Sequence, residues 1–161
     1  MQTRFEVQRQ VSFDAPTTRE QAYQAIANVQ GVLSRSSFIR NVTDRGAGEF
    51  DCKTGVGPLS GRWCAHFAFE PGTRVQWTTK VFSGAGIQGG DLTGEIAVQP
   101  LDGGRCRIAV SFNAMADASV PRLLVGQVRK AFEKLGDSLV RDFCEGIRAG
   151  LEDESEFRAA A

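Results

Sequence analysis

Histidine and paired cysteines are scarce in this sequence of 161 residues. His66 is the single histidine, and Cys52, Cys64, Cys106 and Cys144 form no CxxC pair. Structural zinc sites usually combine such pairs with further cysteines or histidines. We therefore expect neither a zinc site nor any other cofactor, and we expect the four cysteines to be free thiols.

Net charge and long apolar runs are also absent. Lys and Arg together number 19, as do Asp and Glu, so the formal net charge is zero and no basic field exists to hold nucleic acid. No apolar stretch approaches the roughly 20 residues that a membrane-spanning helix needs, and the first residues lack the apolar core of a signal peptide. These absences predict a cytoplasmic protein that binds no nucleic acid, with peripheral contact to a membrane left open.

What the sequence does contain is a long amphipathic helix near its end. Between Val120 and Leu151, apolar residues recur every three or four positions, the period of one helical face. They are Leu124, Val128, Phe132, Leu135, Leu139, Phe143, Ile147 and Leu151. The opposite face carries charges of both signs, including Asp142, and should face water. Glycines at 126, 136, 146 and 150 each cost up to about 1 kcal/mol relative to alanine, so packing must stabilise this helix.

Upstream of this helix the apolar period changes to two, the period of strands. A strand over 4–13 precedes a helix over about 18–28, which Thr17 and Glu20 would cap as a box and Gly31 would end. A second helical turn is predicted over 32–37. Further strands are predicted over 38–44, 49–56, 59–69, 73–82, 91–99 and 105–114. Their short connections indicate antiparallel pairing.

A sheet with one apolar face must be covered, and the last helix is the element available to cover it. One helix about 10 Å across is too narrow to fill the concave side of a twisted seven-stranded sheet, so we expect a cavity between them. The predicted lining, and therefore the predicted ligand site, is Phe38, Trp63, Phe67, Trp77, Phe112, Val128, Phe132, Leu135, Leu139 and Phe143. Residues 1–151 would form one domain, followed by a polar tail over 152–161.

Two motifs accompany this order of elements. Asp14-Ala15-Pro16 follows the first strand, and Gly55-Val56-Gly57-Pro58-Leu59-Ser60-Gly61-Arg62-Trp63 spans a later hairpin. With them, nearly the whole chain resembles the START-like helix-grip superfamily (SRPBCC, polyketide cyclase/dehydrase-like). That α+β fold has the order β-αα-β6-α, with a seven-stranded antiparallel sheet around a long C-terminal helix. The V-G-P-x-x-G turn and Gly89-Gly90-Asp91 are similar to the carbon monoxide dehydrogenase G family within it, a family of accessory proteins.

The resemblance implies a function without catalysis. Members of the superfamily bind hydrophobic molecules such as lipids, quinones or aromatic polyketides. Similarity to the carbon monoxide dehydrogenase G family implies an accessory or recruitment role, with a molybdenum hydroxylase-type enzyme as the partner. Some members carry a membrane anchor beyond the last helix. Here residues 152–161 follow that helix directly, so we do not expect direct anchoring.

Two other functions stay open. A small enzyme of the polyketide cyclase or aromatase type, or a hydrolase, would need a polar side chain that points into the cavity. The candidates are Tyr23, Asn41, Thr79, Asn113 and Asp117. A docking domain with a collapsed cavity would instead use surface apolar residues, for which Val32, Leu33 and Phe157 are the candidates.

Several single features have a plain structural explanation. The stretch 84–89 matches GxGxxG, but a strand is predicted to follow it, whereas a dinucleotide needs a helix there. We expect 83–90 to be a loop that gates the cavity. Strand parity places His66 and Cys64 outside the cavity with no third catalytic residue, and Cys144 should be a buried, inert thiol.

Arginines gather around two of the predicted hairpins. Arg35, Arg40 and Arg45 surround the second strand, and Arg62 and Arg74 flank a later hairpin. A solvated face is the ordinary interpretation of such charges. The functional alternative is a clamp at the cavity mouth, where the planar guanidinium would hold a headgroup or carboxylate.

Overall fold

The computed structural model describes residues 2–36, 39–54, 61–84 and 87–160. The elements in chain order are β1 (Gln2–Ala15), α1 (Arg19–Ala27), α2 (Val29–Ser34), β2 (Ile39–Gly46), β3 (Glu49–Thr54), β4 (Gly61–Glu70), β5 (Arg74–Gly84), β6 (Ile87–Leu101), β7 (Arg105–Ser119), the 3-10 turn η2 (Arg122–Leu124) and α3 (Val125–Ala160). This is the predicted β-αα-β6-α order.

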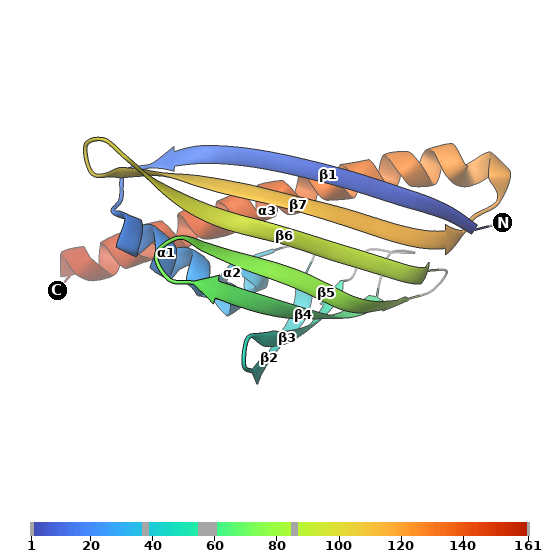
Figure 1. The fold of residues 1–161 in the computed structure, drawn as a ribbon, viewed down its shortest axis with the longest axis horizontal. Coiled ribbons are helices and arrows are strands. Elements are labelled where there is room, and N and C mark those ends of the chain that lie inside the picture. The colour runs from blue at the N-terminus through green and yellow to red at the C-terminus, as the bar shows by residue number, and fades with distance from the viewer. Residues whose placement is uncertain (1, 37–38, 55–60, 85–86, 161) are drawn as a thin grey trace.

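The seven strands form one antiparallel sheet in the order β1-β7-β6-β5-β4-β3-β2. β1 pairs with β7 along its whole length, from Gln2 opposite Ser119 to Ala15 opposite Cys106. Figure 1 shows α3 lying across one face of this sheet, with α1 and α2 beside its C-terminal half. The predicted helix-grip architecture is therefore confirmed.

Alternating apolar residues build the face that α3 covers. On β7, Ile108, Val110 and Phe112 are buried while the residues between them are more exposed. Opposite Phe112, β6 carries Gly94, where a Cβ atom would lie 2.2 Å from Cζ2 of Trp77. Since real Cβ atoms do not approach that closely, only glycine gives the Trp77 ring its place in the core.

The two short helices differ in detail from the prediction. The N-cap of α1 is Thr18, whose side chain accepts a hydrogen bond from the Gln21 backbone N–H, so the Thr17–Glu20 capping box was wrong by one residue. Asn28 rather than Gly31 ends α1, and the Asn28 side chain then caps α2 by accepting from Gly31 N at 3.2 Å. Gly31 lies inside α2 because one asparagine serves both helix ends.

The glycine-rich stretch is mostly strand rather than the predicted gating loop. β5 runs to Gly84 and β6 begins at Ile87, with these two residues opposite each other. Residues 85–86 lie outside the described part of the chain, as do residues 55–60, which include all of the V-G-P-x-x-G turn (56–61) except Gly61. Residues 87–101, which include the end of the GxGxxG match, are all strand. The helix N-terminus that a dinucleotide needs is therefore absent from this stretch.

The long helix continues past the predicted end at Leu151 as far as Ala160, so the expected tail is helical up to that residue. Leu124 lies in the preceding 3-10 turn and is 43% exposed, so it does not contribute to the buried stripe. Asp142 was predicted to face water but is buried, and it accepts a hydrogen bond from the Ser36 hydroxyl at 3.3 Å. The charge pattern missed this residue because its partner lies 106 positions away in the sequence.

Candidate functional site

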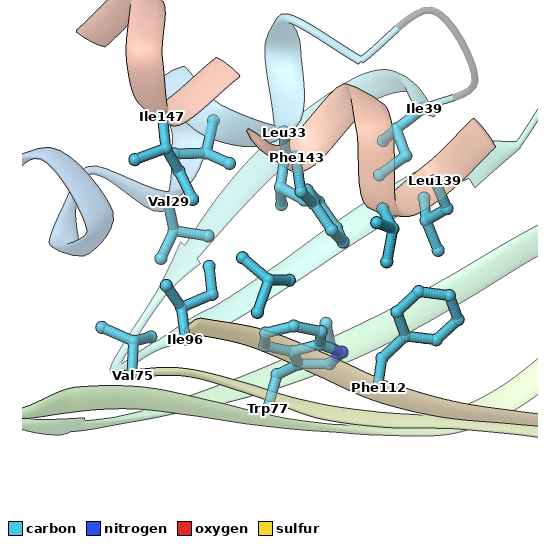
Figure 2. Packing of buried hydrophobic residues seen from close by; sticks show 14 of the residues in the cluster. Val29, Leu33, Ile39, Val75, Trp77, Ile96, Phe112, Leu139, Phe143 and Ile147 are labelled. Atoms are coloured by element: carbon cyan, nitrogen blue, oxygen red, sulfur yellow. The ribbon is translucent and has the colours of Figure 1, made fainter. Parts of the chain in front are cut away.

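The half of α3 from Leu139 to Leu151, together with α1 and α2, covers a tightly filled part of the interior, called here the closed end. Leu139, Phe143 and Ile147 are buried against the sheet. Figure 2 shows Leu139 above Phe112, and Phe143 pointing toward Trp77. The cavity that remains has a volume of about 10 Å³. Its lining consists of Ile26, Val29, Val32, Leu33, Phe67, Val75, Trp77, Ile96 and Phe143. Such a volume holds at most one water molecule.

Aromatic contacts connect the sheet to the helix at the closed end. Phe50 and Phe67 meet edge to face with ring centroids 5.4 Å apart, Phe67 lies 6.0 Å from Trp77, and Trp77 lies 5.7 Å from Phe143. These distances are those of stabilising aromatic pairs. The predicted lining residues Phe67, Trp77, Leu139 and Phe143 are thus brought together, but as packed core around a very small void rather than as walls of an open cavity.

The other half of α3, from Val125 to Asp137, covers what we call the open end of the interior. Its one large buried side chain is Phe132, whose ring lies 6.3 Å from that of Phe5 on β1. The remaining apolar side chains on this face, Val125, Val128 and Leu135, are only half-buried. Three of the predicted lining residues, Val128, Phe132 and Leu135, therefore belong to this less completely covered half.

The strands at the open end present small or partly exposed residues to the helix side. Leu92 on β6 and Ala114 on β7 lie opposite each other, are half-buried and pack against the core. Beyond them on the same face of β7 are Ala116 and Ala118. Alanine fills little of the space that larger residues such as Ile108 and Val110 occupy at the closed end. The inner surface at this end is therefore apolar and incompletely covered.

Trp63 brings a buried polar group to the inner face of the sheet. It lies on β4 between Arg62 and Cys64, opposite Cys52 on β3. Trp63 is only 5% exposed, and its indole Nε1 has no hydrogen-bond partner among the described residues. A buried N–H without an acceptor costs about 1–3 kcal/mol. An acceptor brought by a ligand would recover that energy.

The structure does not bring the candidate enzyme residues together. Thr79 is buried, but its hydroxyl donates to the Leu92 carbonyl at 2.9 Å and accepts from Leu92 N at 2.6 Å. Tyr23 is half-buried beside the core, and burial raises the pKa of its phenol. Asn41 and Asn113 are exposed, and Asp117 forms an ion pair with Arg4. No two of these five side chains share a hydrogen bond in the described structure.

Two of the docking candidates are part of the core. Val32 and Leu33 lie on α2 and are 4% and 2% exposed, so the expectation that they lie on the surface was wrong. Their burial follows from α2 packing between β2 and α3, which the short segment did not reveal. The side chain of Phe157 and residue Phe38, a predicted lining residue, lie outside what the structure describes.

Histidine and cysteine form no reactive set among the described residues. His66 is exposed and Cys64 half-buried, as the strand parity predicted. Burial and, secondarily, Asp51 raise the pKa of the Cys64 thiol, which makes it a weaker nucleophile. Cys144 is buried, and burial raises its pKa as well. No three His, Cys, Asp or Glu side chains converge to hold a metal ion in the described ranges, and none of the helices there could cross a membrane.

Most of the arginines considered for a headgroup clamp have protein partners. Arg74 pairs with Glu70 at 2.6 Å and with Glu95 at 3.4 Å, and Arg45 pairs with Asp51. Arg35 donates to the Gly146 carbonyl at 3.3 Å. These contacts fix the arginines to strands and helix, away from the open end.

No family model and no curated protein matches this sequence. Solved structures do match. The Zhui aromatase/cyclase of Streptomyces sp. R1128 is 12% identical, with a TM-score of 0.66 and 96% of each chain covered. The di-domain aromatase/cyclase StfQ of the steffimycin pathway is 14% identical, with a TM-score of 0.66, 94% of this chain covered and 53% of StfQ.

A START superfamily protein of Mycobacterium smegmatis gives 11% identity, a TM-score of 0.59, and coverage of 92% of this chain and 97% of its own. Identities this low carry information about the fold and not about the reaction. Together with the sheet order and the position of α3, they show that this chain has the helix-grip fold of START-like proteins and of polyketide aromatase/cyclases.

Proposed function

We propose that this protein binds an apolar small molecule at the open end, between the first half of α3 and the inner face of β6 and β7, and catalyses no reaction on it. The observation that carries the proposal is the contrast along one helix. Apolar side chains are buried from Leu139 to Ile147 but only half-buried at Val125, Val128 and Leu135. Incompletely buried apolar surface inside a fold is what an apolar ligand would cover.

The free energy gained by burying this apolar surface is compatible with useful ligand affinity. Burying apolar surface is worth about 25 cal/mol per Å², or about 1.5–3 kcal/mol for a whole Val or Leu side chain. A ligand that completed the burial of Val128, Leu135 and Leu92 would gain part of that amount at each residue. Ordering and desolvation costs reduce the total. The ring of Phe132 and the predicted lining residues Trp63 and Phe112 would complete the site.

Trp63 narrows the ligand class. Because its Nε1 is buried without an acceptor among the described residues, the preferred ligand carries a hydrogen-bond acceptor on an apolar body. Quinones and aromatic ketones have this combination, whereas plain hydrocarbons do not. Among the lipid-like, quinone-like and aromatic molecules expected from the sequence, we therefore favour the carbonyl-bearing ones.

The biological role that we propose is that of an accessory or carrier protein. Support comes from the resemblance of the V-G-P-x-x-G turn at 56–61 and of Gly89-Gly90-Asp91 to the carbon monoxide dehydrogenase G family. On that resemblance, the partner would be a molybdenum hydroxylase-type enzyme in the cytoplasm or at the membrane surface. Co-purification of such an enzyme with the tagged protein from its native host would test the role.

A cyclase-like enzyme is the second candidate, because two of the matching structures are aromatase/cyclases. Against it stands the state of the candidate residues: the Thr79 hydroxyl is already bonded to Leu92, Asp117 is paired with Arg4, and Asn41 and Asn113 are exposed. Turnover of an aromatic polyketide substrate by the purified protein would favour the enzyme over the carrier.

Binding of a naphthoquinone, followed by tryptophan fluorescence and native mass spectrometry, tests the proposed site. Val128→Asp places a charge on the half-buried apolar surface and should weaken binding at least about tenfold, since a desolvated carboxylate is costly. Gln127→Asp adds the same charge at the exposed neighbouring position and should leave binding unchanged. Equal affinity of the two variants would place the ligand elsewhere.

A second variant tests the role of the indole. Trp63→Phe keeps an aromatic ring and removes Nε1–H, so it should weaken naphthoquinone binding about tenfold, the value of one good hydrogen bond, and leave naphthalene binding unchanged. A variant that binds both compounds like the wild type would show that Trp63 donates nothing to the ligand.

A further inference from the structure

Three cations stand in a row on the outer face of the sheet. Arg40 on β2 lies directly opposite Lys53 on β3, and Lys53 lies directly opposite Arg62 on β4. Residues directly opposite each other share a face, and this is the outer one because the adjacent Cys52 and Trp63 are buried on the inner face. Strands lie about 4.7–4.9 Å apart, so the row spans about 10 Å. Like charges placed opposite one another destabilise a sheet.

The three cations of this row lack counter-charges. Arg4, Arg9, Arg45, Arg74 and Arg107 each form an ion pair with a carboxylate. Within the described parts of the chain, Arg40, Lys53 and Arg62 form none. β2 forms the sheet edge opposite β1 (Figure 1), so two of the three lie on the last two strands of the sheet. The fold thus concentrates unneutralised positive charge at one place.

A hollow of about 410 Å³ opens at this row. Its polar lining includes Asn41, Thr43, Arg45, Asp51, Lys53 and Arg62. Asp51 is the one carboxylate among these residues, and it already accepts a hydrogen bond from Arg45 Nε at 2.5 Å. Arg45 and Asp51 neutralise each other, so Lys53 and Arg62 leave the hollow with an excess of positive charge, and Arg40 stands beside Lys53 in the row without lining the hollow. Asn41 adopts a left-handed backbone conformation with φ 52°, at an irregularity in the β2–β3 register that changes the direction of its side chain.

We propose that this outer hollow binds a phosphate-bearing ligand, independently of the apolar ligand of the interior. The guanidinium of Arg62 supplies a planar fork that matches two phosphate oxygens, and Lys53 supplies a compact charge beside it. The Thr43 hydroxyl and the Asn41 amide add neutral donors. The volume exceeds that of a single phosphate group, which favours a diphosphate or a phosphate with an attached group. Bound phosphate would also relieve the repulsion along the row.

Titration with inorganic pyrophosphate at low ionic strength, by calorimetry, tests the site. Lys53→Glu puts a carboxylate between Arg40 and Arg62, so it should weaken pyrophosphate binding at least about tenfold and also raise the thermal midpoint of the ligand-free protein. Lys130→Glu makes the same charge change at an exposed position of α3 and should alter neither quantity. The opposite signs for affinity and stability distinguish a ligand site from a merely structural role of Lys53.

Vesicle sedimentation distinguishes a free phosphate compound from a lipid headgroup. If the wild-type protein binds pyrophosphate but does not sediment with phosphatidic acid vesicles, the natural ligand is a soluble phosphate compound. If it sediments with phosphatidic acid vesicles but not with vesicles of phosphatidylcholine alone, the natural ligand is a lipid headgroup. Two results would overturn the proposal. In the first, neither pyrophosphate nor phosphatidic acid binds the wild-type protein. In the second, both bind Lys53→Glu as well as they bind the wild type.

Discussion

The closed and open ends of the interior are built on the same helix and the same sheet, but only one of them is filled. At the closed end, Phe143 and Ile147 meet α1, α2 and the large side chains of β5 to β7, leaving about 10 Å³. At the open end, Val125, Val128 and Leu135 are only half-buried, and the β7 residues of the inner face are alanines. The difference teaches that α1 and α2, not α3 alone, complete the core, because they cover only one end.

The largest expected effect comes from removing a side chain at the closed end. Ile147 is fully buried, so Ile147→Ala should lower the free energy of unfolding by about 2–5 kcal/mol, as deletion of buried methyl groups usually does. Val128→Ala at the open end removes a half-buried side chain and should cost about 1 kcal/mol or less. Urea denaturation measures both values. Similar costs for the two would contradict the contrast between the ends.

Two glycines of α3 should respond with opposite signs. A Cβ atom on Gly136 would lie 2.9 Å from Cγ2 of Val7, whereas Gly126 has open space around it. Gly136→Ala should therefore destabilise the protein by about 1 kcal/mol, since the branched Val7 must shift, and Gly126→Ala should stabilise it by about 0.5–1 kcal/mol. Thermal unfolding measures both.

The pair Val7→Ala and Gly136→Ala provides the control. If the contact with Val7 is the cause, the double variant should be more stable than the sum of the single effects predicts. Stabilisation by Gly136→Ala alone would show that α3 does not approach β1 this closely.

The smallest effect is expected in thiol labelling, which probes local opening at each end. Cys52 lies opposite Trp63 on the inner face, and Cys144 lies at the closed end. Labelling of Cys52 should slow when a naphthoquinone is bound, whereas labelling of Cys144 should not change. Alkylation followed by peptide mass spectrometry gives both rates, and equal protection of both thiols by the ligand would indicate global stabilisation instead.

The pH dependence of stability has a definite sign at Cys52. Burial, with smaller contributions from Asp51 and Cys64, raises the pKa of Cys52 from 9.0 to about 12. A raised pKa in the folded state means that the contribution to stability is complete below about pH 9 and is lost as pH rises toward about 12. Cys52→Ala should therefore show a shallower loss of stability over that range in alkaline denaturation.

The sequence predicted the fold because both periods were clear. Alternation on the strands and the three-to-four spacing from Val128 to Leu151 predicted a sheet covered by a helix, and the structure has it. Boundaries were less accurate: Thr18 rather than Thr17 caps α1, since neighbouring threonines offer the same hydroxyl. Burial of Asp142 depended on Ser36, which no local pattern connects to it.

The candidate site was predicted only in outline. Periodicity places Phe143 and Val128 on one stripe of the helix. It cannot show that α1 and α2 fill the space beside Phe143 and leave the space beside Val128 unfilled. The unpartnered Nε1 of Trp63 was likewise invisible, because hydrogen-bond satisfaction depends on atoms from several strands. The cation row on β2, β3 and β4 appeared in the sequence as separate arginines, since only the register aligns them.

The pairing of β1 with β7 also sets how the chain reaches its native state. Ala15 lies opposite Cys106 and Gln2 opposite Ser119, so the first strand finds its partner only after all of residues 16–105 are available. Contacts of such long sequence separation slow folding, because the entropy of closing the long loop is lost before the strand contacts can stabilise the chain. Until β7 arrives, β1 exposes Phe5 and Val7 along an unpaired edge. During synthesis, this segment is the part of the protein most in need of protection from aggregation.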